Sequence, residues 1–134
     1  MIVWGPALNS SVAAVSVGDE ALGTQTESWN GTSWTEVNDF NNGRSETGIG
    51  GNTSAALLFG GYSPPAPVTN TEEWNGTSWT EVNDLNAGVA YQFSGGTGVS
   101  GAVSAGGYTG TANTTNTEDW TGAGAPLIQT FTDS

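Results

Sequence analysis

The chain has 134 residues, and its 13 carboxylates stand against a single cation, Arg44, so the net charge is −12. Such a surface repels phosphate backbones and anionic lipid headgroups, which argues against nucleic-acid and membrane partners. The sequence contains no His and no Cys. Disulfides, thiolate metal sites and the usual nucleophilic dyads are therefore excluded, and no cofactor is expected.

The first third of the chain predicts four antiparallel strands. Ile2–Leu8 is the expected first strand, and the short apolar run Ala13–Asp19 suits a strand buried on both faces. The segment Glu27–Asp39 then contains Trp-Asn-Gly-Thr-Ser-Trp. Its Asn-Gly pair predicts a hairpin between two aromatic strand ends, because both residues tolerate the positive φ of tight turns.

The rest of the chain repeats this pattern. Glu27–Asp39 returns 45 residues later as Glu72–Asp84 with one substitution in thirteen, and a decayed third copy, Thr117–Gly122, is displaced by a further 46. Further first strands and apolar runs ending in Gly-Gly are expected at Arg44–Gly50, Ala55–Tyr62, Val89–Gly95 and Gly101–Tyr108. The sequence thus predicts three repeats with boundaries near 1–40, 41–85 and 86–134.

A four-stranded unit of this length, with a Gly-Gly doublet after the second strand and paired aromatics in the last two, resembles a kelch repeat. The Trp-Asp and Gly-His signatures of WD40 repeats are missing. The Trp-to-Trp spacing of five departs from the family, which usually has a Tyr and a more distant Trp. The resemblance implies an all-β protein whose residues 1–134 form one domain of kelch-like β-propeller blades.

The near-identical repeats also resemble tandem-repeat hypothetical proteins of marine phages, which implies a virion or extracellular protein. The N-terminal segment Met1–Pro6 has neither a basic region nor a long apolar stretch. No signal peptide is therefore expected.

Three blades are too few for a closed propeller, which typically has four to eight. An open arc would leave apolar sheet faces in water. We therefore expect self-association, most simply a homodimer in which two chains form a six-bladed ring about a twofold axis. The alternative is a fragment, or an arc that is attached to a larger assembly.

Positions that differ between the repeats are the candidates for ligand binding. Aligning the first strands on the apolar runs brings Trp4, Glu46 and Tyr91 to one position, with Arg44 two residues before Glu46. Because the first strand lines the channel of propellers, Trp4, Arg44, Glu46 and Tyr91 are candidate residues of a pocket that stacks on sugars. The alternative is packing between blades by the aromatic residues and pairing of Arg44 with Glu46 or another carboxylate.

Other candidate chemistry is weaker. The pairs Glu72–Glu73 and Glu118–Asp119 could resemble a glycosidase site, but adjacent strand residues face opposite sides, so we interpret them as solvated charges on edge strands. The Asn- and Asp-containing loops 38–43 and 83–88 lack the spacing of a calcium loop, which favours Asx turns, and no metal site is predicted. The loop containing Pro64–Pro67 follows a Gly doublet, where propellers usually bind partners.

The sequence therefore predicts a non-enzymatic binding or assembly module that engages a glycan or a protein partner. A multivalent glycan-binding lectin is the first alternative, and a glycoside hydrolase is the second.

Overall fold

The structure of the chain is a computed structural model that describes residues 2–4, 14–17, 22–122 and 127–129. Within these ranges all regular secondary structure is β, and no residue is helical. The predicted all-β class is therefore confirmed. In the same part of the chain there is no helix long and apolar enough to cross a membrane.

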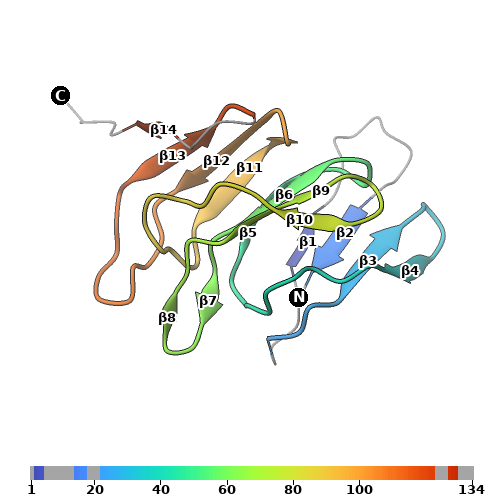
Figure 1. The fold of residues 1–134 in the computed structure, drawn as a ribbon, viewed down its shortest axis with the longest axis horizontal. Coiled ribbons are helices and arrows are strands. Elements are labelled where there is room, and N and C mark those ends of the chain that lie inside the picture. Colours follow the sequence, from blue (N-terminus) through green and yellow to red (C-terminus); the bar gives the residue numbers. More distant parts are fainter. Residues whose placement is uncertain (1, 5–13, 18–21, 123–126, 130–134) are drawn as a thin grey trace.

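The strands form three four-stranded antiparallel sheets and one short hairpin (Figure 1). The first sheet has the order β1 (Ile2–Trp4), β2 (Ala14–Val17), β3 (Thr26–Trp29), β4 (Trp34–Val37). The second has the order β5 (Gly48–Gly51), β6 (Ala56–Phe59), β9 (Thr71–Trp74), β10 (Trp79–Glu81). The third has the order β11 (Phe93–Gly98), β12 (Gly101–Ala105), β13 (Thr117–Trp120), β14 (Leu127–Gln129). The hairpin joins β7 (Tyr62–Ser63) to β8 (Ala66–Pro67).

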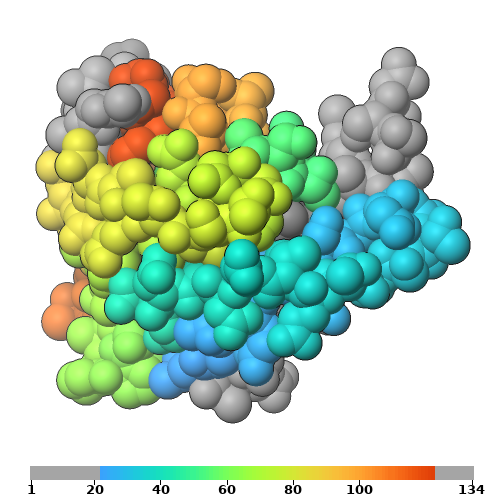
Figure 2. Space-filling model, turned by 45° about the vertical axis from the view of Figure 1, so that its right-hand side comes forward, coloured from blue at the N-terminus to red at the C-terminus, as the bar shows by residue number. Residues whose placement is uncertain are grey.

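The three sheets follow one another in an open row, with the second sheet between the other two (Figure 1). The described residues do not close into a ring of sheets. In the space-filling view the β3–β4 hairpin of the first sheet projects at the right-hand edge of the molecule (Figure 2). Residues 38–47 link the first sheet to the second, and residues 82–92 link the second to the third. We call these segments the first and second linkers.

The Trp-Asn-Gly-Thr-Ser-Trp segments form hairpins as predicted, but by a different turn. Trp29 pairs with Trp34 across a four-residue loop, in which the side-chain oxygen of Asn30 accepts the N–H groups of the two loop residues that follow Gly31. Only the glycine has a positive φ, 103° at Gly31. Asn30 does not use the positive φ that it tolerates, because it shapes the turn through its side chain as an Asx turn.

The first strands of the second and third sheets begin later than predicted. β5 starts at Gly48 and β11 at Phe93, so the stretches 44–47 and 89–92 belong to the linkers. Glu46 and Tyr91 have φ of 53° and 57°, in the left-handed region, and this breaks the extended backbone. The predicted strand Ile2–Leu8 is described only at Ile2–Trp4, and the remainder lies outside the described residues.

The core lies between the sheets. β6 is buried along its whole length, which confirms the prediction of a strand buried on both faces for the second repeat. For the third repeat it was wrong, because Val103 of β12 is exposed. One cluster contains Leu58 and Ala56 with Trp74, Trp79, Ile49 and Phe40, and lies between the first and second sheets. The other contains Leu57 and Phe59 with Leu85, Val89, Ala102 and Trp120, and lies between the second and third sheets.

Alternate residues of β6 therefore face opposite neighbours. We call the face of a sheet that points to the next sheet in chain order its forward face, and the opposite face its rear face. Leu57 and Phe59 lie on the forward face of the second sheet. Trp74 and Trp79 lie on its rear face, where they pack with Phe40 of the first linker.

Candidate functional site

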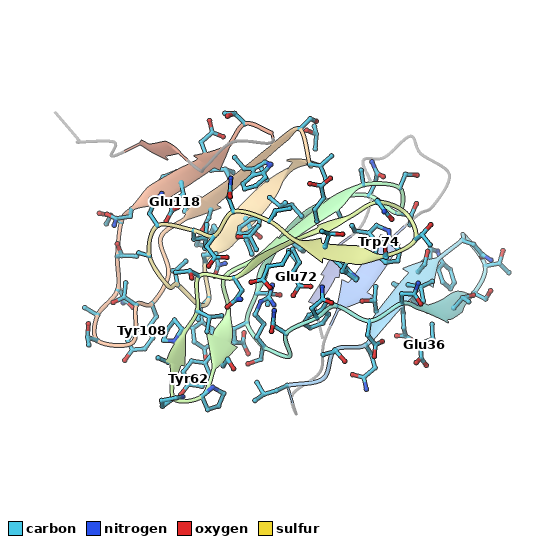
Figure 3. All side chains as sticks on the ribbon, in the orientation of Figure 1. Glu36, Tyr62, Glu72, Trp74, Tyr108 and Glu118 are labelled. Carbon is cyan, nitrogen blue, oxygen red and sulfur yellow. The ribbon has the colours of Figure 1, made fainter. Side chains whose placement is uncertain are left out.

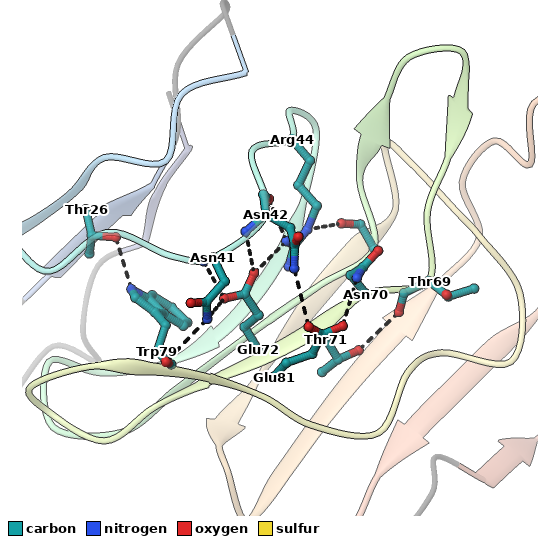
Figure 4. A network of polar contacts seen from close by, with 11 residues as sticks. Thr26, Asn41, Asn42, Arg44, Thr69, Asn70, Thr71, Glu72, Trp79 and Glu81 are labelled. Atoms are coloured by element: carbon teal, nitrogen blue, oxygen red, sulfur yellow. Dashed lines mark hydrogen bonds and ion pairs between the residues drawn. The ribbon is translucent and has the colours of Figure 1, made fainter.

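Arg44 is a buried structural residue, only 1% exposed. Its guanidinium contacts the carboxylate of Glu72 at 2.8 Å and donates to the backbone carbonyls of Gly60 and Asn42, each at 2.8 Å (Figure 4). Of the alternatives in the sequence, pairing of Arg44 with a carboxylate other than Glu46 is the one observed. A ligand on the surface does not reach this side chain.

Glu72 is completely buried and is bound on both of its oxygens. Asn41 donates its backbone and side-chain N–H groups to Oε2, each at 2.7 Å, and Asn42 donates its backbone N–H to Oε1 at 3.2 Å (Figure 4). The first linker thus wraps around the carboxylate. These Asn residues, predicted as Asx turns, bind a buried anion of the next sheet instead.

The third sheet repeats this arrangement without the cation. Glu118, 7% exposed, accepts the backbone and side-chain N–H groups of Asn86 at 2.9 and 3.1 Å. The backbone N–H of Ala87 lies 3.4 Å from its second oxygen. Val89 stands where the first linker has Arg44. The interpretation of Glu72 and Glu118 as solvated edge-strand charges was wrong, because β9 and β13 are inner strands and the linkers cover them.

Glu46 and Tyr91 occupy equivalent positions, as the alignment predicts. Each precedes its first strand by two residues, each has a positive φ, and both are exposed. The N–H of Tyr91 donates to the carbonyl of Glu46 at 3.2 Å. The two residues are therefore neighbours across the second and third sheets, but Arg44 is buried and does not join them on the surface.

Trp4 does not share their position. Trp4 pairs with Val15 on the second strand of the first sheet. The residues that make the equivalent pairing in the other two sheets are Gly50 and Gly95. The predicted alignment of Trp4 with Glu46 and Tyr91 was therefore wrong by four residues. The side chain of Trp4 is outside the described part of the structure, so its place in a pocket stays a prediction.

A wide, shallow hollow of about 510 Å³ lies on the third sheet beside Tyr91. It is lined by Tyr91, Phe93, Gly106, Gly107, Tyr108, Asn113 and Thr114. Tyr91 is 62% exposed and Phe93 is 83% exposed. Figure 3 shows Tyr108 at the lower left of the molecule. The hollow combines aromatic faces with a side-chain amide and open backbone.

The equivalent place on the second sheet is filled by the second linker. There the N–H of Gly61 donates to the carbonyl of Val89 at 2.8 Å, and the side chain of Gln92 donates to the carbonyl of Phe59 at 2.9 Å. Gly107 is the counterpart of Gly61, since the carbonyl of each glycine accepts a hydrogen bond from the backbone N–H of the residue seven positions later. Within the described part of the chain no acceptor meets the N–H of Gly107. The hollow is thus the counterpart of a surface that the second linker covers on the second sheet, left open by the described residues.

Sequence reasoning identified Tyr91 but missed its neighbours Phe93, Tyr108 and Asn113. The available signal was the repeat itself: the third sheet carries Phe93 where the second has Gly48, each at the start of its first strand. No group of three or more possible metal ligands occurs among the residues that the structure describes.

No protein-family model matches the chain, and a comparison with curated proteins finds no significant match.

Proposed function

We propose that the chain is a non-enzymatic binding and assembly module made of three kelch-like propeller blades, each blade being one of the four-stranded sheets. It works by packing a segment of a protein partner into the hollow on the third sheet. The open row of sheets, the Gly doublets after β6 and β12 and the aromatic hairpins support this proposal.

The filled counterpart of the hollow is the observation that carries the proposal. On the second sheet the same surface holds residues 88–92 by backbone and side-chain hydrogen bonds. On the third sheet the same surface is open and carries Phe93 and Tyr91 in contact with water. Exposed aromatic surface of this kind marks interaction sites in soluble proteins. The hollow therefore suits an extended peptide better than it suits a reacting substrate.

The carboxylates support a role without catalysis. Glu72 and Glu118 are buried, and linker amides bind their oxygens. Their neighbours Glu73 and Asp119 lie on the following position of each strand and so point to the opposite face. No adjacent pair converges on one substrate, as the two carboxylates of a glycosidase must.

A peptide with the sequence of residues 86–93 tests the proposal. Titrated into the isotopically labelled chain, it should shift the backbone amide resonances of Gly107, Tyr108 and Thr114 in a saturable way. Phe93→Ala should weaken the binding, and Glu36→Ala, an exposed position on β4 of the first sheet, is the control. Shifts spread evenly over the molecule, or none at all, would contradict the proposal, as would a scrambled peptide that binds equally well.

The second candidate is a glycan-binding lectin, which the aromatic rings and Asn113 of the hollow favour. Aromatic faces pack on sugar rings, and a side-chain amide bonds their hydroxyls. The geometry favours one site per chain, because the second linker fills the equivalent surface of the second sheet. A glycan array followed by calorimetry would measure both the ligand and the stoichiometry. Absence of saturable sugar binding eliminates this candidate.

The setting in a phage virion or outside a cell stays a prediction. It rests on the resemblance of the repeats alone.

A further inference from the structure

The contact between neighbouring sheets follows one repeated pattern. A forward face presents apolar side chains of the second strand, Leu57 and Phe59 in the second sheet, and the next sheet covers them with Ala102 and Trp120. The first strands approach closely, since a Cβ on Gly50 would lie 3.1 Å from the carbonyl carbon of Gly95. We call this contact between consecutive sheets of one chain the internal interface.

The forward face of the third sheet has apolar residues at the same positions, and none of the described residues covers it. Val103 takes the position of Leu57, because each pairs with the second acidic residue of the neighbouring strand. The side chain of Leu57 is 1% exposed, whereas that of Val103 is 39% exposed. A Cβ on Gly95 would meet nothing within 4 Å. This face therefore lacks the neighbour that the second sheet has.

An aromatic ring is retained on that face. In the second sheet Phe59 pairs with Gly48, and in the third sheet Phe93 pairs with Ala105, so the ring has moved across to the facing strand. The forward face of the third sheet thus keeps the ring that packs between the sheets elsewhere in the chain.

The rear face of the first sheet is also left uncovered by the residues that the structure describes. The ring centroids of Trp29 and Trp34 lie 5.4 Å apart, and their planes meet at 45°. Trp74 and Trp79 have almost the same geometry, with centroids 5.3 Å apart and an angle of 45°. Trp79 is 6% exposed because the first sheet and its linker cover it, whereas Trp34 is 40% exposed. The indole pair therefore has the same geometry in both sheets. Among the described residues, only the pair of the second sheet is covered by a neighbouring sheet.

The polar part of the rear face is also incomplete. Glu27 has the strand position of Glu72 and Glu118 but is only half-buried. No residue in the described ranges donates a hydrogen bond to it, whereas a linker from the preceding sheet binds the other two carboxylates. In repeat arrays the terminal units usually carry a polar outer face. Among the described residues, both end faces of this row expose large apolar side chains, Trp34 at one end and Val103 and Phe93 at the other.

We propose that a second copy of the chain docks head to tail, its first-sheet rear face on the third-sheet forward face. This inference goes beyond the proposed peptide site, because it concerns the two end faces of the row and names a second copy of the chain as the partner. Trp29 and Trp34 of one copy cover Val103 and Phe93 of the other. The two faces are the separated halves of an interface that the chain forms twice within itself.

One hydrogen bond of the internal interface predicts a bond in the complex. Trp79 donates its indole N–H to the hydroxyl of Thr26 at 3.0 Å. Trp34 has the position of Trp79, and Thr117, half-buried at the start of β13, has the position of Thr26. The Trp34 indole of one copy therefore donates to Thr117 of the other. Because the contact is heterologous, identical junctions close a ring when the rotation per chain allows it.

Solution mass as a function of concentration tests the proposal. The unmodified chain should associate into an integral multiple of 13.6 kDa. Trp34→Glu blocks the rear face and Val103→Glu blocks the forward face, and each should raise the dissociation constant at least about 30-fold, as loss of a central anchor does. Ser54→Glu, at an exposed turn of the second sheet, adds the same charge elsewhere and should leave the mass unchanged.

Mixing the two blocked variants distinguishes head-to-tail docking from a symmetric contact. Trp34→Glu keeps an intact forward face and Val103→Glu keeps an intact rear face, so an equimolar mixture should form a one-to-one dimer although neither variant associates alone. A symmetric contact through one face would give no such rescue. Circular dichroism confirms that each variant is folded, and Phe93→Glu replaces Val103→Glu if the latter is not.

Three results would overturn the inference: a chain that stays monomeric at every concentration, association unaffected by both substitutions, or failure of the mixture to dimerise. None of them bears on the proposed function, which the peptide titration tests on the monomeric Trp34→Glu variant, where the hollow is intact. Conversely, the mixed variants could dimerise as expected while the chain binds no peptide. That result would support head-to-tail docking and reject the peptide site.

Discussion

Trp79 donates its indole N–H to the hydroxyl of Thr26 at 3.0 Å, and this bond joins the second sheet to the first. Both side chains are buried, and the indole also packs edge-on against Phe40 with ring centroids 6.4 Å apart. A single tryptophan thus combines apolar contact with a buried polar bond between two sheets.

Replacing Trp79 should therefore cost more than replacing its repeat equivalent. Trp79→Phe leaves the Thr26 hydroxyl unsatisfied, so we expect a loss of about 1–3 kcal/mol in the free energy of unfolding. Trp34→Phe removes an exposed indole and should cost less than about 0.5 kcal/mol in the monomer. Urea unfolding at low protein concentration measures both, and equal losses would contradict the assignment of Trp79 to the interface.

The buried ion pair predicts a difference between two equivalent glutamates. Glu72→Gln leaves the Arg44 guanidinium buried without its counter-charge, and removal of one partner of such a pair costs about 3–5 kcal/mol. Glu118→Gln should cost less, about 1–2 kcal/mol, because no cation faces Glu118 and the amide oxygen still accepts from Asn86. Chemical denaturation of the two variants gives the comparison. A larger loss for Glu118→Gln would show that the linker amides, and not Arg44, dominate.

Two glycines at the same repeat position should respond differently to alanine. A Cβ on Gly50 would lie 3.1–3.2 Å from backbone atoms of Gly95 and Gly96, so Gly50→Ala should destabilise the chain by about 1–3 kcal/mol through overpacking. Gly95→Ala meets open space and should be neutral in the monomer. Thermal unfolding reports the stability of both. If head-to-tail docking occurs, Gly95→Ala should also weaken association, since it crowds the first strand of the second copy.

Salt should strengthen self-association. Each copy carries a net charge of −12, so two copies repel one another at low ionic strength. The Debye length falls from about 10 Å at 0.1 M salt to about 3 Å at 1 M, which screens this repulsion while the apolar faces are unaffected. Sedimentation at a series of sodium chloride concentrations measures the effect. Dissociation on adding salt would instead indicate an interface held by ion pairs.

The repeat made the strands predictable, because periodic apolar runs and Asn-Gly turns are local signals. The starts of the first strands of the second and third sheets could not be predicted. Glu46 and Tyr91 adopt a left-handed conformation there that neither residue type requires. The alignment of Trp4 failed for another reason: eleven positions separate Trp4 from its partner Val15, whereas seven separate Gly50 from its partner Leu57. The sequence also named Tyr91 as a candidate without indicating that Phe93 would stand exposed beside it.

The burial of Glu72 escaped prediction for a different reason. Its donors come from Asn41 and Asn42, some thirty residues earlier, and no local pattern links the linker to the carboxylate. Arg44 was a candidate for ligand binding because it differs between the repeats, and pairing with a carboxylate was the alternative. It varies because the second sheet alone balances its buried carboxylate with a cation, and the third sheet uses amides alone.

The linkers have a further consequence for the order in which the chain folds. Each linker is synthesised before the carboxylate that it binds, so Asn41 and Asn42 are already present when Glu72 emerges from the ribosome. The hydrogen-bond donors of the buried carboxylate are thus present as soon as its strand can form. The sheets can therefore form one after another from the N-terminus. A sheet excised without the linker that precedes it would have to bury its glutamate alone, which makes a lone unit a poor folding domain. Growth by whole units at the C-terminal side is thus the direction in which such a chain can be lengthened.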